Sequence, residues 1–173
     1  MELTDIMPLE KWVALEEEIC SKFRVDANVF NVDGIRITDH KDWQNQLCPA
    51  IKATDKGQSF ICAVAHMNLA AIARNTGKPV AEECDAGLIK IVVPIFLKGA
   101  FLGALCGCGV MLEGGEADSF LINKMTDIDT EEVERLAAGI REISQDDVDA
   151  FVSYAKQRIG QILADHKAGI DGR

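Results

Sequence analysis

The stretch that decides the fold begins at Cys84-Asp85-Ala86-Gly87-Leu88, continues through Ile91-Val92-Val93-Pro94-Ile95, and ends at Cys106-Gly107-Cys108-Gly109. Lys98-Gly99 lies between its two apolar runs, and such a dipeptide is typical of the two-residue turn of a β-hairpin. Both faces of this hairpin are largely apolar. The sequence therefore predicts that the hairpin lies centrally in a sheet that is covered on both sides.

The register of the hairpin follows if Leu97 faces Ala100 across the turn, because cross-strand partners share a face of the sheet. The glycines of the second strand then leave one face short of side chains, so that a helix or a ligand can approach the backbone. We expect the functional site on that face, at Gly103, Gly107 and Gly109. The same register pairs Ile95 with Leu102, Val93 with Ala104, Ile91 with Cys106 and Ile89 with Cys108.

Length and charge limit the classes of protein to which the chain can belong. Its 173 residues suit one domain with terminal helices, which we place at residues 1–168, followed by a frayed tail at residues 169–173. The 28 acidic and 18 basic residues give a net charge of −10, which argues against a nucleic-acid-binding surface. Lys90 and Lys98 interrupt the longest apolar run, which argues against a membrane span. Because no secretion signal begins at Met1, we expect a cytoplasmic protein.

Periodicity divides the chain into helices and strands. Helical spacing runs from about Pro8 to Phe23 and from Ser59 to Asn75, and it returns in two helices near the C-terminus. With the hairpin, the extended segments predict an α+β fold in which an antiparallel sheet of about five strands carries helices on its faces, as in GAF and PAS sensory modules. Those extended segments are Ala27–Val32 and Ile35–Thr38 around Asp33-Gly34, and Val80–Cys84; the two C-terminal helices run from Asp129 to Ile140 and from Ser144 to about His166.

One family shares an ordered set of these motifs. From roughly Pro8 to Glu113 the chain resembles the PocR-type sensory domain, whose central motif usually reads Cys-His-Ala-Gly-Leu, with Asp85 replacing the histidine here. The resemblance implies a non-catalytic, GAF/PAS-like domain that senses small molecules, proposed to be simple hydrocarbon derivatives such as diols. Such domains usually adjoin a DNA-binding or kinase output domain, so we expect a separate signalling protein as partner. The matching residues are Cys48, Cys62, Cys84-Asp85-Ala86-Gly87-Leu88, Val93-Pro94-Ile95, Gly99 and Gly103.

The cysteines suggest where a ligand binds. In the cytoplasm, six cysteines are more often free thiols, metal ligands or redox groups than structural disulfides. Cys62 and His66 are four positions apart and so share a helix face. The interpretation we favour is a pocket for an organic ligand lined by inert thiols. Its expected lining is Cys48, Cys62, His66, Cys84, Asp85, Gly103, Cys106 and Cys108.

Three other interpretations stay open at this point. Cys48, Cys62, Cys84 and Cys108 are the residue types that bind zinc or an iron–sulfur cluster, although their spacing matches no zinc-finger pattern. Cys106 and Cys108 suggest a redox switch, and Cys62 or Cys84 with His66 suggests a thiol-dependent enzyme. The last is a scaffolding protein that acts through its terminal helices and has a fully packed interior.

The last helix predicts self-association. Its apolar stripe runs the length of residues 144–166, about 30 Å, whereas a sheet face is only about 20 Å long. We therefore expect part of the stripe to project past the sheet and, with the first helix, to form a four-helix bundle in a homodimer. Movement of the sheet on ligand binding would then change how these helices pack. The stripe consists of Val148, Phe151, Val152, Ala155, Ile159, Ile162 and Leu163.

Overall fold

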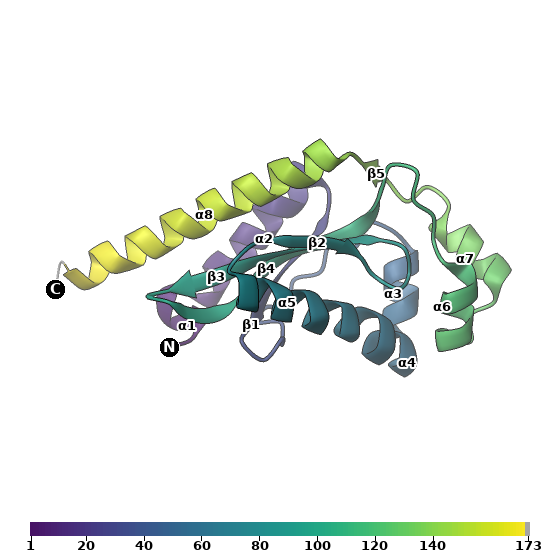
Figure 1. Ribbon diagram of the computed structural model, residues 1–173, viewed down its shortest axis with the longest axis horizontal. Coiled ribbons are helices and arrows are strands. Elements are labelled where there is room, and N and C mark those ends of the chain that lie inside the picture. The colour runs from purple at the N-terminus through teal and green to yellow at the C-terminus, as the bar shows by residue number, and fades with distance from the viewer. Residues whose placement is uncertain (172–173) are drawn as a thin grey trace.

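The computed structural model describes residues 1–171 and shows an open sheet between layers of helices (Figure 1). Four strands form the antiparallel order β1-β4-β3-β2, and a short fifth strand runs parallel to the end of β4. The predicted α+β class, with an open sheet of GAF/PAS type and helices on both faces, is confirmed. The strands are β1 Asp26–Asn31, β2 Val80–Glu83, β3 Ile89–Leu97, β4 Ala100–Leu112 and β5 Glu142–Ile143.

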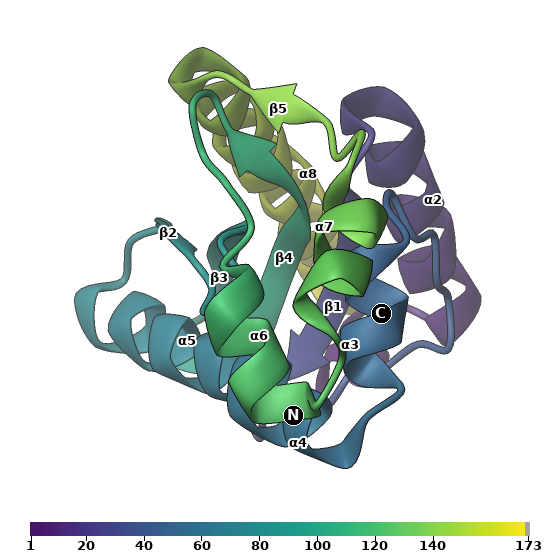
Figure 2. The same cartoon turned by 90° about the vertical axis from the view of Figure 1, so that its right-hand side faces the viewer.

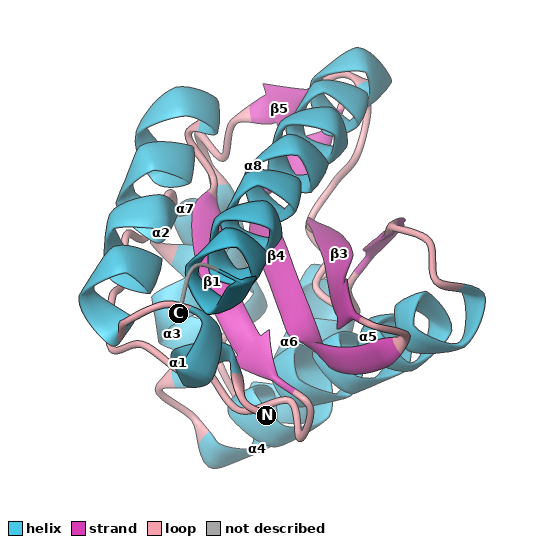
Figure 3. Ribbon diagram, turned by 90° about the vertical axis from the view of Figure 1, so that its left-hand side faces the viewer, coloured by secondary structure: helices cyan, strands magenta, loops and turns pink. Residues whose placement is uncertain are grey.

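The helices form three groups around the sheet. The first group, α1, α2 and α8, covers one face, and Figure 3 shows α8 lying across the strands. On the opposite face a helix with an initial π-turn packs on β2 and β3. The third group consists of α3, α4, α6 and α7 and packs at one end of the sheet (Figure 2). The bounds are α1 Leu3–Ile6, α2 Leu9–Phe23, α3 Leu47–Lys52, α4 Asp55–Gly57, π-helix η1 Gln58–Ala63, α5 Val64–Thr76, α6 Ser119–Thr126, α7 Thr130–Ala137 and α8 Gln145–Asp171.

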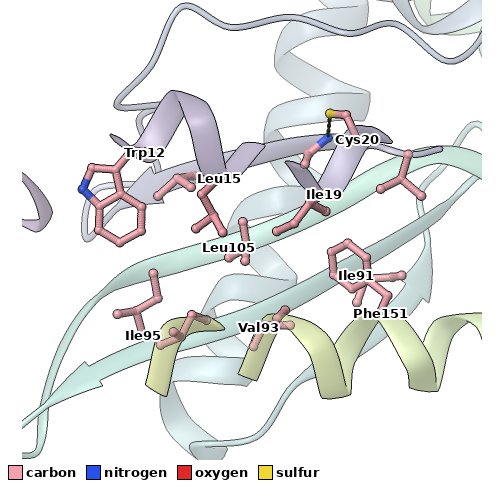
Figure 4. Packing of buried hydrophobic residues seen from close by; sticks show 14 of the residues in the cluster. Trp12, Leu15, Ile19, Cys20, Ile91, Val93, Ile95, Leu105 and Phe151 are labelled. Carbon is pink, nitrogen blue, oxygen red and sulfur yellow. Dashed lines mark hydrogen bonds between the residues drawn. The ribbon is translucent and has the colours of Figure 1, made fainter. Parts of the chain in front are cut away.

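The main core lies between the sheet and the α2/α8 layer. In Figure 4, Trp12, Leu15 and Ile19 of α2 face Leu105 of β4, while Phe151 of α8 lies beside Ile91 of β3. These side chains are almost fully buried, and burial of each contributes about 1.5–3 kcal/mol relative to leaving it exposed. Among the described residues, no helix combines the length and the hydropathy that a membrane span requires.

The predicted turn is correct, but the predicted register is wrong beyond it. Leu97 faces Ala100 across Lys98-Gly99, both of which have positive φ angles, 51° and 82°, as a type I′ turn requires. An irregularity between Ile95 and Phe96 then shifts the pairing by one residue. Pro94, which cannot donate a hydrogen bond to the ladder, lies beside it. Ile95 consequently pairs with Gly103, Val93 with Leu105, Ile91 with Gly107 and Val92 with Cys106.

This shift changes what the glycines do. A Cβ atom on Gly107 would lie 2.8 Å from two atoms of the Phe151 ring, so the missing side chain admits helix α8. Gly103 has a φ of 148°, and a Cβ there would collide with the carbonyl oxygen of Phe30 and lie 3.0 Å from Leu3 Cδ1. The space beside these two glycines is therefore occupied by the protein itself, not by a ligand cavity.

Two further expectations about the elements need correction. Ile35–Thr38 is not a strand, because only an isolated bridge joins Arg36 to Phe30, and the fifth strand is β5 instead. The helix expected at Ser59–Asn75 contains η1, whose extra residue per turn rotates the faces of the helix. The stripe expected to include Phe60 and Met67 faces outward, with these two side chains 54% and 63% exposed.

Helix α8 is longer and better covered than expected. It continues to Asp171, past the predicted end near His166, so residues 169–171 of the expected tail are helical. Its last turns extend beyond the body of the domain (Figure 1). The apolar stripe does not project with them, because Ile159 and Ile162 are 7% and 8% exposed and belong to the main core. Residues 172–173 lie outside the described part of the chain.

Candidate functional site

A cavity of about 430 Å³ opens at the α5 side of the sheet. Its walls come from the loop after β1, from α3, from η1 and the start of α5, and from the ends of β3 and β4 that lie nearest to them. Apolar side chains form most of the lining, among them Phe30, Trp43 and Leu88. A cavity of this size and character is typical of a binding site for a small organic molecule.

Five of the eight expected site residues line this cavity although they are far apart in the chain. Cys48 comes from α3, Cys62 from η1, His66 from α5, Cys84 from the turn after β2, and Cys108 from β4. Three helical segments, the turn after β2 and strand β4 therefore bring these side chains together, as the pocket interpretation requires. Asp85, Gly103 and Cys106 do not line the cavity.

Local hydrogen bonds place Cys48 and Cys84. The Asn45 side chain accepts a hydrogen bond from the Cys48 backbone N–H at 2.7 Å and donates to the Gly109 carbonyl oxygen at 2.8 Å, which ties α3 to β4. Cys84 donates its backbone N–H to Leu88, and its carbonyl oxygen accepts from Gly87, both at 2.8 Å. This tight turn holds the Cys84 thiol at the cavity.

Asp85 occupies the exposed corner of the same turn and lines a separate surface hollow with Glu116 and Ser119. Its carboxylate is therefore not one of the groups that face the cavity. The replacement of the usual histidine by Asp85 alters the outer surface of the turn and leaves the cavity wall unchanged.

Cys106 lies behind the cavity wall, in contact with His66. Its Sγ atom is 3.9 Å from Nδ1 of His66, and both residues are buried. Burial, followed by the charges of Lys90 and Lys52, lowers the pKa of His66 to about 3, so the imidazole is neutral at physiological pH. The other ring nitrogen, Nε2, is buried without a hydrogen-bond partner.

Burial favours the protonated form of four thiols at or behind the cavity wall. Burial raises the pKa of Cys62 to about 11 and that of Cys106 to about 12, and it also raises the pKa values of Cys48 and Cys108. Besides burial, the Cys108 thiol, when ionised, raises the pKa of Cys48 further. All six cysteines of the chain are free thiols. The site therefore presents neutral, soft, weakly polar groups.

The thiols gather but do not form a coordination set. Within residues 1–171, no three histidine, cysteine, aspartate or glutamate side chains are arranged to hold a metal ion. Structural zinc and iron–sulfur clusters require several thiolates converging on one point. Zinc or an iron–sulfur cluster on Cys48, Cys62, Cys84 and Cys108 therefore stays a prediction.

Lys90 is the main site residue that the sequence analysis missed. It lies on β3, lines the cavity and is 8% exposed. Burial lowers the pKa of its ammonium group, but nearby thiols, above all Cys108, outweigh that effect when ionised and raise the pKa overall. Thiols that burial keeps protonated do not supply that counter-charge, so the charged form of Lys90 needs another partner at this cavity. A lysine inside the apolar run 88–97 was the signal in the sequence, since lysine is rarely buried without a role.

Acidic and basic groups also meet at the mouth of the cavity. Asp26 is 2% exposed and its Oδ1 atom has no hydrogen-bond partner. Burial raises the pKa of this carboxyl, and the charges of Arg36 and Lys52 oppose that shift. The carboxylate of Asp26 is thus balanced by two cations that line the same cavity.

Comparison with known proteins places the domain in a family. The model of the sensory domain found in PocR matches residues 5–166, which is nearly the whole chain. The chain belongs to the PocR sensory-domain family. No curated protein and no solved structure matched it. In this PocR sensory domain, Cys84 lies in the turn that carries the family motif. It lines the same cavity as the preceding cysteines Cys48 and Cys62.

Proposed function

We propose that this PocR sensory domain is a non-catalytic sensor that binds a small organic molecule in the thiol-lined cavity. The observation that carries the proposal is the cavity itself, which is large enough for such a ligand and lies within a domain of a sensory family. Its wall combines apolar side chains with a few buried polar groups, Lys90 and His66 among them. That combination gives a ligand both affinity and a fixed orientation.

The geometry supports binding better than thiol catalysis. A thiol nucleophile needs a base within hydrogen-bonding distance and a lowered pKa. Among the described residues, neither Cys62 nor Cys84 hydrogen bonds to His66, and the sulfur within hydrogen-bonding range of its ring is that of the buried Cys106. The raised pKa of Cys62 also keeps this thiol protonated.

Strand β3 offers a route from the cavity to the terminal helices. Lys90 faces the cavity, whereas the next residue, Ile91, lies on the opposite face of the sheet beside Phe151 of α8 (Figure 4). Protein cores are closely packed, so a shift of β3 on ligand binding changes how the Phe151 side chain packs against the strand. We take α8, whose last turns extend beyond the domain, as the output element toward a separate signalling protein.

Trp43 provides the direct test, because its side chain lines the cavity. The variant Trp12→Phe leaves Trp43 as the single tryptophan, since the chain has two. Titration of small organic molecules into this variant is expected to change the Trp43 emission and to raise the melting temperature by mass action. Ala63→Phe fills the cavity and is expected to abolish both effects, whereas the exposed Ala71→Phe is the matched control. Equal responses in both alanine variants would contradict the proposal.

A homodimer in the cytoplasm completes the proposal. The six free thiols suit a reducing compartment. For the dimer, the stripe on α8 no longer serves as support, because it is buried within one protomer. The support comes instead from an outward-facing stripe on η1 and α5, where Phe60, Val64 and Met67 are 54%, 37% and 63% exposed. Sedimentation of the full chain measures the assembly directly.

Zinc or an iron–sulfur cluster on Cys48, Cys62, Cys84 and Cys108 is the second candidate. It is favoured by the convergence of the four thiols on one cavity. Metal analysis and the ultraviolet–visible spectrum of protein purified without oxygen decide between the two. Stoichiometric zinc, or the visible absorption of a cluster, lost in Cys62→Ser, would establish the metal site.

A further inference from the structure

The cation in the cavity has no acidic partner. Lys90 is 8% exposed, and within residues 1–171 it forms no ion pair and donates no hydrogen bond from its side chain. Its Nζ atom lies 5.4 Å from the centre of the Phe30 ring, which stabilises the ammonium only weakly. Burial therefore disfavours the ammonium form of Lys90 in the ligand-free protein, and a ligand that supplies a counter-charge favours it.

The acidic groups nearest in the fold do not remove this charge. Glu82 is the cross-strand partner of Lys90 on β2, but its side chain is exposed and makes no ion pair with Lys90. Asp26 lines the cavity, yet the cations that act on its carboxyl are Arg36 and Lys52. The surrounding thiols are neutral. Around the cavity, the lysines and arginine outnumber the carboxylates by one, in a chain whose net charge is −10.

A second residue that lines the cavity carries a polar atom with no partner. His66 lines the cavity, and its buried Nε2 atom has no hydrogen-bond partner. The neutral imidazole carries one N–H group, and the Cys106 thiol lies 3.9 Å from the other nitrogen, Nδ1. When the thiol donates to Nδ1, the ring proton is on Nε2 and can be donated to a ligand oxygen. The cavity then offers a cation and a neutral donor.

We propose that the ligand of this cavity is a small organic acid, whose carboxylate binds Lys90 Nζ and His66 Nε2 and whose apolar body packs against Phe30, Trp43 and Leu88. This inference rests on the proposed function and specifies the chemical class of the ligand. A monocarboxylate supplies the single counter-charge that a protonated Lys90 lacks, and its oxygens can accept hydrogen bonds from both side chains that line the cavity. The apolar body matches the rest of the lining.

Other ligand classes match the same groups less well. A metal cation would meet the Lys90 ammonium at close range. A phosphate dianion requires more donors than Lys90 and His66 provide. A neutral alcohol or diol leaves the buried ammonium without a counter-charge, and this costs more than the hydrogen bonds with a hydroxyl return.

Matched acids and alcohols test the inference. Butanoate, hexanoate and benzoate are titrated calorimetrically into the full chain at pH 7, beside 1-butanol, 1-hexanol and benzyl alcohol, which keep the same apolar bodies. A short diol completes the set. We expect at least one acid to bind about tenfold or more tightly than its alcohol, the loss that follows from removing a hydrogen bond to a charged group. Lys90→Met is expected to abolish that preference, and Lys52→Met, at the same cavity, to retain it.

Each outcome has a separate meaning. If an alcohol or the diol binds at least as tightly as its acid, or if Lys90→Met keeps the preference, the acid inference is wrong while the proposed sensor function stands. If nothing in the set or in a broad library of neutral and charged molecules binds the cavity, the proposed function itself fails.

A second readout uses the unmodified protein, so that the test survives if Lys90→Met does not fold. Cys62 lines the cavity and is partly exposed. Its alkylation by N-ethylmaleimide is followed by mass spectrometry with saturating acid or alcohol present. Protection by the acid, but not by its alcohol, supports the inference; protection by both alike overturns it.

Discussion

The imidazole of His66 stacks on the ring of Phe30, with 3.7 Å between the ring centres and 23° between the planes. This contact joins α5 to β1 directly at the cavity wall. It also keeps the imidazole away from water, which explains why burial is the main cause of its lowered pKa.

The first prediction follows from that pKa. The unfolded chain binds a proton at His66 near pH 6.5, whereas the folded protein does so only near pH 3. Between these values the unfolded state binds more protons, so the free energy of unfolding falls as the pH is lowered from about 6.5 toward about 3. His66→Gln is expected to show a shallower pH dependence than wild type in urea unfolding. His40→Gln is the control, and an equal change in both variants would contradict the assignment.

The second prediction concerns Glu16, which is fully buried in α2. Its carboxylate accepts hydrogen bonds from the Val29 backbone N–H at 2.7 Å and from Thr38 Oγ1 at 2.5 Å. Burial raises the pKa of Glu16 above its usual 4.5, so the folded state holds its proton longer than the unfolded state. The contribution of Glu16 to unfolding free energy therefore decreases as the pH rises from about 4.5 through the raised pKa, opposite in sign to His66. Glu16→Gln is expected to remove this dependence.

Glu16→Ala separates the structural role from the titration. It leaves the Val29 N–H buried without an acceptor, which costs about 1–3 kcal/mol at all pH values. Denaturant unfolding at pH 5 and pH 7 measures both variants. A Glu16→Ala protein as stable as wild type would show that water replaces the carboxylate.

The third prediction compares two glycines. Gly107→Ala is expected to destabilise the domain by about 1–3 kcal/mol, because the new methyl group would lie 2.8 Å from the Phe151 ring. Gly160 is the control, since a Cβ there meets nothing within 4 Å on the exposed side of α8. Gly160→Ala is expected to stabilise the domain by about 0.5–1 kcal/mol through helix propensity. Thermal unfolding of both variants tests the close approach of α8 to β4.

The fourth prediction concerns assembly. Ile159→Glu with Ile162→Glu places two charges in the main core and is expected to unfold the domain, as circular dichroism would show. Phe60→Glu with Met67→Glu changes exposed positions and is expected to leave the fold intact while converting a dimer to a monomer. A folded monomer from the α8 variant, with a persistent dimer from the η1/α5 variant, would return the interface to α8.

The fifth prediction concerns thiol reactivity. Because only the thiolate reacts, and because burial raises the pKa of Cys62 to about 11, alkylation of Cys62 should be slow at pH 7 and accelerate as the pH rises. Cys106 is fully buried and should react only on unfolding. Mass spectrometry after timed exposure to iodoacetamide measures both. Rapid reaction of Cys62 at pH 7 would favour the thiol-enzyme interpretation.

The sequence by itself determined the class of the domain and most of its elements. The Lys98-Gly99 turn and the helix from about residue 8 to residue 23 depend on local conformational preferences, which adjacent residues express without the rest of the fold. The motif around Cys84 identified the family for the same reason, because it is contiguous. Cys84 lies in that motif, and the residue types of Cys48, Cys62, His66 and Cys108 made them candidates before the fold brought all five to one cavity.

Only the tertiary structure decided which side chains share a face of the sheet and which helix faces are exposed. One irregularity beside Ile95 shifts the hairpin by a residue, and with a side-chain period of two a single step changes which side chains share a face. The stripe that includes Phe60 and Met67 likewise faces outward, because other faces of η1 and α5 pack on the protein. Whether Lys90 lacks an acidic partner depends on side chains from β1, β2, α3 and η1. No local pattern encodes their distances, because these are set by how the segments pack around β3.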